Sequence, residues 1–172
     1  MNPQQSKFLR RVGRLNHGVI LVEKSILIVL MLGMLVFGFL QVFSRFVLRA
    51  PIGWSEELLT YSFSWASFVG ASLAIYSNSH FSVDLVTKHL GKTIQKVVKV
   101  AVWTMILAFS LYLLVTGVRL ALLNSIQRMN IVPLSMFWAY LSVPVMGLFI
   151  VIHGMEKLLE VFFDLHEEEV VE

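Results

Sequence analysis

Two adjacent carboxylates, Glu56 and Glu57, are the charged groups in this sequence whose position most needs a chemical explanation. They follow Trp54 and lead directly into a long uncharged run. A charged side chain at the centre of a bilayer costs roughly 2.5–3.5 kcal/mol on insertion scales. We therefore expect the pair at a membrane interface, where carboxylates can form ion pairs or contact a partner protein.

The residues around the pair predict a helix start. Ser55 is expected to cap a helix whose first turn contains both glutamates, because the helix dipole favours carboxylates there by about 0.3–1 kcal/mol. Trp54 prefers the headgroup region. Arg45 and Arg49 end the preceding helix on the same side, and we expect them to pair with the glutamates across the short loop. Two interpretations stay open: a capped helix start with ordinary surface ion pairs, or a polar rim that fixes a partner protein.

The histidines offer a second kind of chemistry. His80 and His153 are the two of the five histidines that lie near predicted helices. Two histidines facing each other in a helix bundle could hold a haem, whereas histidines at membrane edges are more often interfacial polar residues. The sequence contains no cysteine, no HExxH motif and no GxxxxGK[ST] loop. We therefore expect no catalytic residue, metal site or cofactor, and keep a haem-binding anchor subunit of a respiratory enzyme as the alternative.

The elements that position these residues follow from composition. Hydrophobic residues make up 57% of the 172 residues and charged residues 15%, against about 25% charged in an ordinary soluble domain. The hydrophobic residues form four uncharged runs, each close to or above the roughly 20 residues that a membrane-spanning helix needs. The expected fold class is an all-α integral membrane protein. A single membrane domain over residues 1–172 should hold an amphipathic surface helix at about 3–17 and transmembrane helices at about 19–47, 54–77, 92–124 and 133–163.

Three local patterns refine this plan. Hydrophobic residues at helical spacing within the basic segment 3–17 are typical of a helix on an anionic leaflet, the alternative being a disordered basic tail that only fixes topology. Pro133 is expected to open the last helix, since proline is tolerated in a first turn. A small residue at every fourth position of the second helix predicts a packing seam for another helix: Ser62, Ala66, Gly70 and Ala74.

Orientation follows from the distribution of Lys and Arg, which mark the cytoplasmic side. These residues concentrate before the first predicted helix and between the second and third, while the other two connections hold two each. Both termini should therefore be cytoplasmic, and the remaining loops should face the periplasm of a Gram-negative host. The net charge of +3 is a topology signal and not a nucleic-acid footprint, so no nucleic-acid partner is expected.

The four runs do not resemble a transporter that works alone. Substrate and ion sites of secondary transporters usually lie at mid-depth on broken helices within repeated halves. Here the runs contain no charge at mid-depth, and no internal repeat is visible. A scaffold or accessory membrane subunit is the favoured interpretation, and a small autonomous channel or exporter is a further alternative.

Residues 41–86 carry a resemblance to a known family. They contain Arg45 near the end of the first helix, a Trp-x-Glu-Glu segment at residues 54–57, a stretch from Trp65 to Gly70 and Ala71, and a turn with His80 and Asp84. In this order and spacing they resemble the small membrane subunit of tripartite ATP-independent periplasmic (TRAP) transporters. The sequence is similar to members of the sialic-acid type. The number of helices and the basic N-terminus match along the rest of the chain.

The resemblance implies partners and a role. A periplasmic protein would capture an organic acid, N-acetylneuraminate being the suggested example, and a large membrane subunit would move it with sodium ions. The small subunit would support the large one in the bacterial inner membrane, among membrane lipids, and help to dock the capture protein. The resemblance assigns structural or partner contacts to nine residues: Arg45, Arg49, Trp54, Glu56, Glu57, Trp65, Gly70, His80 and Asp84. Arg119 and Arg128 are weaker candidates for docking.

Overall fold

The computed structural model describes the backbone of residues 3–50, 52–87 and 92–169, and the side chains of residues 11–50, 52–77 and 94–161. Within these ranges the chain is helical: α1 (Pro3–Phe46), α2 (Gly53–Thr87), α3 (Lys92–Leu123), α4 (Phe137–Tyr140) and α5 (Ser142–Glu169). Four stretches are long and hydrophobic enough to cross a membrane, at 11–46, 53–77, 94–123 and 137–161. The prediction of an all-α protein with four membrane-spanning helices is confirmed.

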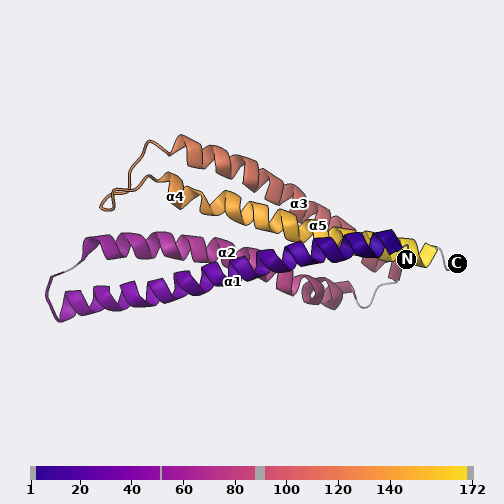
Figure 1. Cartoon of the computed structure of the whole chain (residues 1–172), viewed down its shortest axis with the longest axis horizontal. Coiled ribbons are helices and arrows are strands. Elements are labelled where there is room, and N and C mark those ends of the chain that lie inside the picture. Colours follow the sequence, from indigo (N-terminus) through magenta and orange to yellow (C-terminus); the bar gives the residue numbers. More distant parts are fainter. Residues whose placement is uncertain (1–2, 51, 88–91, 170–172) are drawn as a thin grey trace.

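The helices form two antiparallel hairpins, α1 with α2 and α3 with α5 (Figure 1). The hairpins meet through α2 and α5, and α1 also reaches α5. Both chain termini lie at one end of the bundle, which we call the terminal end (Figure 1). The opposite end, which we call the loop end, holds the α1–α2 turn and the connection 124–136 (Figure 1).

The first helix differs from the prediction of a separate surface helix followed by a transmembrane helix. Residues 3–46 form one continuous helix of 44 residues, with no break near residue 18. Gly18 costs only about 1 kcal/mol relative to alanine inside a helix, which is too little to end it. Asn16 and Glu23 lie two turns apart on one face and both contact α5, so the helix must stay regular between them.

The last membrane-spanning segment also begins differently from the prediction. Pro133 does not open a helix, since the first helical residue after it is Phe137. The proline in a first helical turn is instead Pro144 of α5. Proline provides no N–H and its ring crowds the carbonyl four residues earlier, here that of Tyr140. The regular helix is therefore interrupted at Leu141, between α4 and α5.

Glycines bring α3 and α5 closest together. A methyl group added at Gly117 would lie 2.8 Å from Cδ of Pro144, and one at Gly147 would lie 3.0 Å from the backbone of Ser110 and Leu114. The predicted small-residue seam on α2 does not produce a comparable approach within the chain, because Gly70 meets only the Leu27 side chain at 3.8 Å and Ala74 is exposed. Small residues allow such close backbone contact where lipid removes the hydrophobic force between helices.

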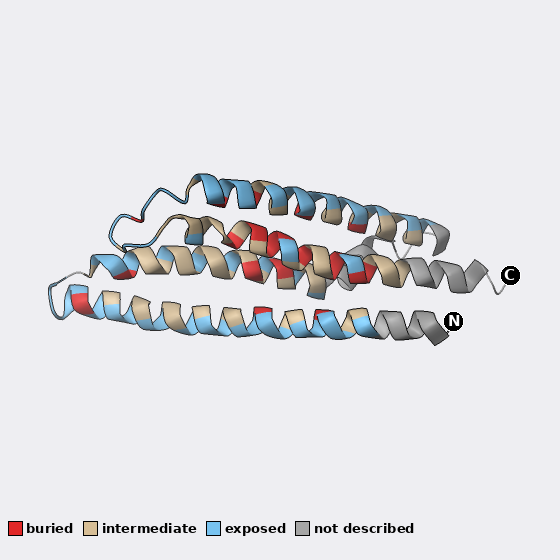
Figure 2. Ribbon diagram, turned by 45° about the horizontal axis from the view of Figure 1, so that its top comes forward, coloured by how far each residue is buried: buried red, intermediate tan, exposed pale blue. Residues whose placement is uncertain are grey.

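Burial is distributed unevenly among the helices. Buried residues gather on α5, whereas α1 is exposed along most of its length (Figure 2). No residue in the most hydrophobic stretch of α1 is buried within the chain. Large side chains such as Leu35, Phe39 and Phe46 are 71%, 67% and 74% exposed. This surface of α1 therefore faces lipid or another protein.

Candidate functional site

Glu57 joins the two hairpins at the loop end. Its carboxylate accepts hydrogen bonds from the backbone N–H groups of Asn130, Ile131 and Val132, with N···O distances of 2.6, 2.8 and 2.8 Å. Glu57 lies in the second turn of α2, and its three donors belong to the connection between α3 and α4. A carboxylate that accepts several backbone N–H bonds holds its partner loop more tightly than neutral acceptors do.

The loop presents these N–H groups because it folds back on itself. Met129 N–H donates to Leu134 O at 2.9 Å, and Met136 N–H donates to Gln127 O at 2.9 Å. Between them, Leu134 N–H donates to Val132 O at 2.7 Å across Pro133, whose fixed φ suits such a tight turn. Three successive N–H groups are thereby left without backbone acceptors and turned toward one point, an arrangement that binds anions.

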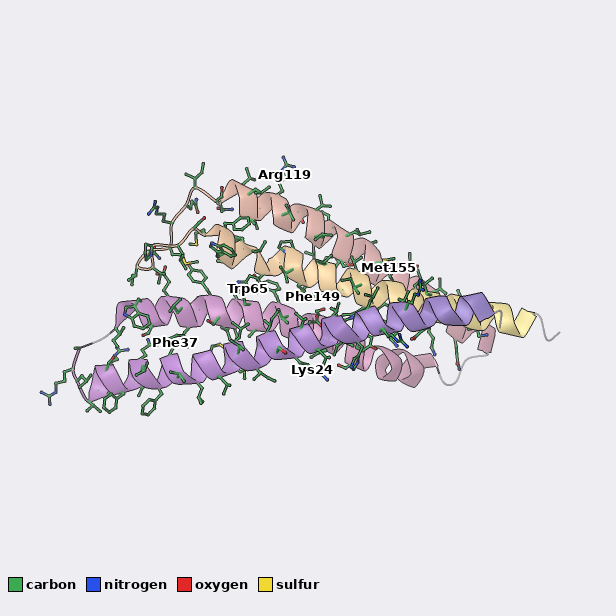
Figure 3. All side chains as sticks on the ribbon, viewed as in Figure 1. Lys24, Phe37, Trp65, Arg119, Phe149 and Met155 are labelled. Atoms are coloured by element: carbon green, nitrogen blue, oxygen red, sulfur yellow. The ribbon has the colours of Figure 1, made fainter. Side chains whose placement is uncertain are left out.

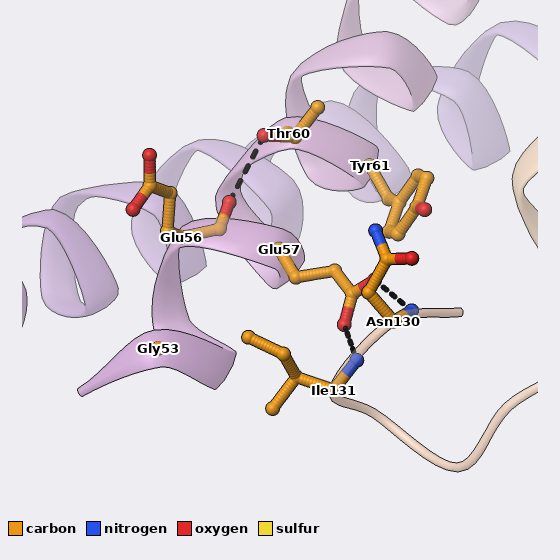
Figure 4. Close-up of a pocket in the computed structure, with 7 residues that line it drawn as sticks. All are labelled: Gly53, Glu56, Glu57, Thr60, Tyr61, Asn130 and Ile131. Carbon is orange, nitrogen blue, oxygen red and sulfur yellow. Dashed lines mark hydrogen bonds between the residues drawn. The ribbon is translucent and has the colours of Figure 1, made fainter.

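A pocket surrounds this contact (Figure 4). Its walls come from the first two turns of α2 and from the loop: Gly53, Glu56, Glu57, Thr60, Tyr61, Asn130 and Ile131. The Glu56 side chain is exposed, and its backbone carbonyl accepts a hydrogen bond from the Thr60 hydroxyl at 3.0 Å. The two adjacent glutamates therefore do different things, since Glu57 is bound within the chain and Glu56 faces outward.

The predicted cap at Ser55 is wrong. The helix begins two residues earlier, at Gly53, so Ser55 lies inside the first turn. Its buried hydroxyl donates to the carbonyl of Ile52 at 2.7 Å instead of accepting from an N–H group. The hydroxyl takes this role because a residue already within the turn is close to the carbonyl three residues before it.

The predicted ion pairs of Arg45 and Arg49 with the glutamates are also absent from the residues that the structure describes. Both arginines are exposed at the end of α1 and in the following turn. Arg49 has a φ of 53°, in the left-handed region, which turns the chain toward α2. Glu57 points to the 130–132 backbone, so the arginines and Glu56 remain on the outer surface of the loop end.

The two tryptophans among the predicted contact residues, Trp54 and Trp65, both make specific contacts near the loop end. Trp54 packs edge-on against Phe37 of α1, with ring centroids 6.0 Å apart and an interplanar angle of 81°. Trp65 Nε1–H donates to the carbonyl of Trp138 in α4 at 2.9 Å. One tryptophan therefore ties α2 to α1, and the other ties α2 to the second hairpin.

The remaining predicted residues do not join a single site. Gly70 faces α1 midway along α2. His80 and Asp84 lie in the last turns of α2, and their side chains fall outside the described residues. Arg119 is exposed on α3 and projects away from the bundle, and Arg128 is exposed on the loop (Figure 3). The two arginines share the loop end with Glu56 but are not in contact with it.

A second polar cluster lies at the terminal end, where sequence reasoning had singled out only His153. The ring Nε2 of His153 lies 2.9 Å from Oε2 of Glu23, and Nδ1 lies 2.5 Å from Oδ1 of Asn16. The Asn16 amide also bonds Oε2 of Glu156. His153 and Glu23 are 0% exposed and Asn16 is 1% exposed. We call this chain of side chains, Glu23–His153–Asn16–Glu156, the polar relay.

Groups from α2 and α5 complete the surroundings of the polar relay. The Tyr76 ring lies against His153, with centroids 4.8 Å apart. Lys157 lies 5.1 Å from the centre of the Tyr76 ring and forms an ion pair with Glu160 at 2.9 Å. A haem would need a free ring nitrogen as axial ligand, and both nitrogens of His153 face oxygen atoms of the chain. The described residues also contain no group of three side chains placed to hold a metal ion.

Comparison with known proteins finds similarity along most of the chain. Residues 16–164 match the family model described as the DctQ component of tripartite ATP-independent periplasmic transporters. The chain is 27% identical over 137 residues to the sialic acid TRAP transporter small permease protein SiaQ of Vibrio cholerae, which covers 80% of this chain and 79% of SiaQ.

Two proteins of Haemophilus influenzae match over shorter stretches. A putative TRAP transporter small permease protein is 33% identical over 79 residues, which are 46% of this chain and 48% of that protein. The sialic acid TRAP transporter permease protein SiaT is 35% identical over 63 residues, which are 36% of this chain but only 10% of SiaT.

Proposed function

We propose that this chain, which belongs to the family of DctQ components of tripartite ATP-independent periplasmic transporters, supports a separate large transport subunit in the bacterial inner membrane. The exposed hydrophobic surface of α1 carries this proposal. Its most hydrophobic stretch has no buried residue within the chain, while the other three membrane-spanning segments each have some. A helix that is so little covered by its own chain widens the surface available to a larger membrane partner.

The match to SiaT supports the same partner. The matching 63 residues make up only 10% of SiaT, so most of that permease has no counterpart in this chain. A stretch resembling this small subunit and a much larger part therefore occur in one polypeptide. A separate small chain that performs the same task would bind its large partner within the membrane.

We place the loop end in the periplasm and the terminal end in the cytoplasm. The basic residues in the first turns of α1 and of α3 lie toward the terminal end, and basic residues mark the cytoplasmic side. The loop end then offers Glu56, Arg45, Arg119 and Arg128 as exposed charges for docking a periplasmic substrate-binding protein. Glu57 would set the shape of this surface from within, by holding the loop 130–132.

The cargo we propose is an organic acid, with sialic acid as the leading example, moved together with sodium ions by the large subunit. The support is that the names of SiaQ and SiaT refer to sialic acid. The described residues of this chain contain no group of three His, Cys, Asp or Glu side chains placed to hold a metal ion.

Reconstituted uptake tests the supporting role. Liposomes with the large subunit, the binding protein and a sodium gradient should lose most uptake when this chain is omitted, and liposomes with this chain alone should show none. Normal uptake without the chain would overturn the proposal.

A double substitution tests the loop end. Glu56→Ala with Glu57→Ala should reduce complex assembly or uptake far more than membrane insertion, because interfacial acids contribute little to insertion. Glu56→Ala alone is the matched control that leaves the loop contact intact. Equal uptake by the wild type and the double variant would reduce Glu57 to a local structural role.

A further inference from the structure

The basic residues of the loop end are all arginines. Four of them lie there, and all four are exposed: Arg45, Arg49, Arg119 and Arg128. No lysine occurs at residues 25–87 or 100–156, the two stretches that contain the loop end. Arginine presents a planar fork of N–H donors that matches a carboxylate or a phosphate, whereas lysine presents a point charge. The residue type therefore indicates that this end of the bundle recognises a planar or multi-oxygen anion.

The acidic residues of the loop end do not balance these arginines. Glu56 and Glu57 are the only acidic residues at positions 25–83 and 100–155. The Glu57 carboxylate already accepts three backbone N–H groups, so Glu56 is the acid that remains on the surface. Within the described part of the chain, none of the four arginines forms an ion pair. The loop end thus carries an excess of positive charge that the chain itself does not compensate.

Arg49 and Arg128 are the two arginines that the helices do not explain. Arg45 lies in the last turn of α1, where the helix dipole favours a cation, and Arg119 lies on α3 one turn before its end. Arg49 and Arg128 instead lie in the α1–α2 turn and in the connection 124–136, the outermost segments of the loop end (Figure 1). Arg49 also keeps a φ of 53°, and strained backbone of this kind is concentrated at functional sites.

These two arginines belong to segments that meet at the pocket of the loop end. The pocket wall includes Gly53, four residues after Arg49, and Ile131, three residues after Arg128. A methyl group added at Gly53 would lie 3.0 Å from Cδ1 of Ile131, so the two segments are in contact there. Arg49 and Arg128 therefore lie close in sequence to one shared contact and can face the same partner.

Glu57 fixes the segment that carries Arg128. Its carboxylate binds the N–H groups of residues 130–132, and Arg128 pairs with Ser135 in an antiparallel bridge across the same loop. A backbone that is already ordered lowers the entropic cost of binding a partner. Glu57 is thus a positioning residue for Arg128, although it does not touch the partner.

We propose that the loop end recognises surface carboxylates of the periplasmic substrate-binding protein, with Arg49 and Arg128 as the contacts. This inference rests on the docking role under Proposed function and gives that partner a chemistry, an acidic surface. The position of the two arginines favours a protein over a phospholipid. Arg45 and Arg119 belong to the membrane-spanning stretches 11–46 and 94–123, whereas Arg49 and Arg128 lie beyond them on the side placed in the periplasm.

Association kinetics test the inference. The complex of this chain with its large subunit is held in nanodiscs, and the rate at which the purified binding protein associates is measured at low and at high salt. Arg49→Glu with Arg128→Glu should slow association at low salt by about tenfold or more, because opposite charges steer the encounter and like charges oppose it. The difference from the wild type should shrink at high salt, which screens exposed charges.

Three further variants separate the contributions. Arg11→Glu with Arg14→Glu is the matched control, because it makes the same charge change at two exposed arginines of the terminal end, and it should associate as the wild type does. Arg49→Lys with Arg128→Lys keeps the charge but loses the donor fork, so association should be unchanged while dissociation becomes several-fold faster. Glu56→Gln removes the surface acid and should speed association with an acidic partner, whereas a basic partner surface would make it slow association.

The outcomes distinguish this inference from the docking role on which it rests. If the wild type binds and the Arg→Glu pair binds equally well or faster, the inference is wrong and the docking role stands. Slower association in Glu56→Gln, or unchanged dissociation in the lysine pair, would also contradict it. Loss of bound phospholipid from the Arg→Glu pair in native mass spectrometry, with partner binding unchanged, would make the arginines lipid contacts instead. No binding by the wild-type complex at either salt concentration would overturn the docking role and this inference together.

Discussion

Two glutamates fasten the bundle, one at each end, and they do so through different kinds of partner. Glu57 accepts three backbone N–H groups at the loop end. Glu23 faces a histidine at the terminal end, in a relay closed at its other side by the Glu156 carboxylate. The first contact binds a carboxylate to the backbone of a loop, whereas the second is a buried network of side chains that links two helices.

The difference lies in the donors and not in the glutamates. Backbone N–H groups cannot lose their protons, so a site made from them always favours an anion. At the terminal end the contacts are made by side chains, and His153 and Glu23 are both 0% exposed. The loop end is therefore held through backbone groups, and the terminal end through buried side chains.

The largest effect on this comparison is expected from Glu23→Ala. It leaves Nε2 of the buried His153 without its partner, although Nδ1 keeps its contact with Asn16, and breaking a buried pair typically costs about 3–5 kcal/mol. We expect the free energy of unfolding in mixed micelles to fall by about that amount. Glu23→Gln keeps the shape and one oxygen of this side chain and should retain most of the stability, and an equal loss in both variants would show that the carboxylate itself is required.

Gly117→Ala tests whether the two ends are held independently. The new methyl group would lie 2.8 Å from Cδ of the rigid Pro144 ring, and overpacking of this kind costs about 1–3 kcal/mol. The free energy of unfolding should fall, while the distance between α1 and α5 at the polar relay should be unchanged because the contact lies elsewhere on α5. Gly38→Ala, where nothing lies within 4 Å, is the control and should not destabilise the chain.

Glu57→Gln should weaken the loop end without affecting the terminal end. Glutamine keeps one acceptor oxygen but places an NH₂ group where N–H groups already point. Amide hydrogen exchange at residues 130–132 should accelerate about tenfold or more, as expected for the loss of charge-assisted bonds. Glu56→Gln should leave these rates unchanged, and comparable acceleration in both variants would show that general surface charge protects the loop.

The sequence predicts the helices better than it predicts either joint. Four uncharged runs of sufficient length allow few alternatives in a membrane, because every backbone group must be satisfied within its own helix. The helix starts were less predictable. Pro133 and Pro144 are equally compatible with a first turn, and the choice between them depends on the loop that Glu57 holds.

The joints depend on contacts between distant parts of the chain. The pattern around Glu57 predicted ion pairs with Arg45 and Arg49, but the partners of Glu57 within the chain are backbone N–H groups, which no residue type reveals. Glu23 and Asn16 carry a weak signal, since two polar residues seven apart lie on one face of a hydrophobic helix. That spacing indicates a buried polar contact on α1, but it does not identify His153 and Glu156 as its partners.

The smallest effect is expected at Arg49, in the turn that leads into the loop end. Its φ of 53° is a conformation that disfavours side chains with a Cβ atom, at a cost of about 1 kcal/mol. Arg49→Gly removes this strain but gives the unfolded chain more freedom, so the free energy of unfolding should rise by less than about 1 kcal/mol. Arg49→Ala removes the same charge and keeps the strain, so it should not be stabilising.

Uptake by the two variants separates the role of the charge from the role of the turn. If uptake falls equally in both variants while only Arg49→Gly is more stable, the Arg49 charge contacts a partner and the turn stabilises the fold. Unchanged uptake in both would leave the turn as the only role of this residue, and would place the docking surface on Glu56 and the α3–α4 loop.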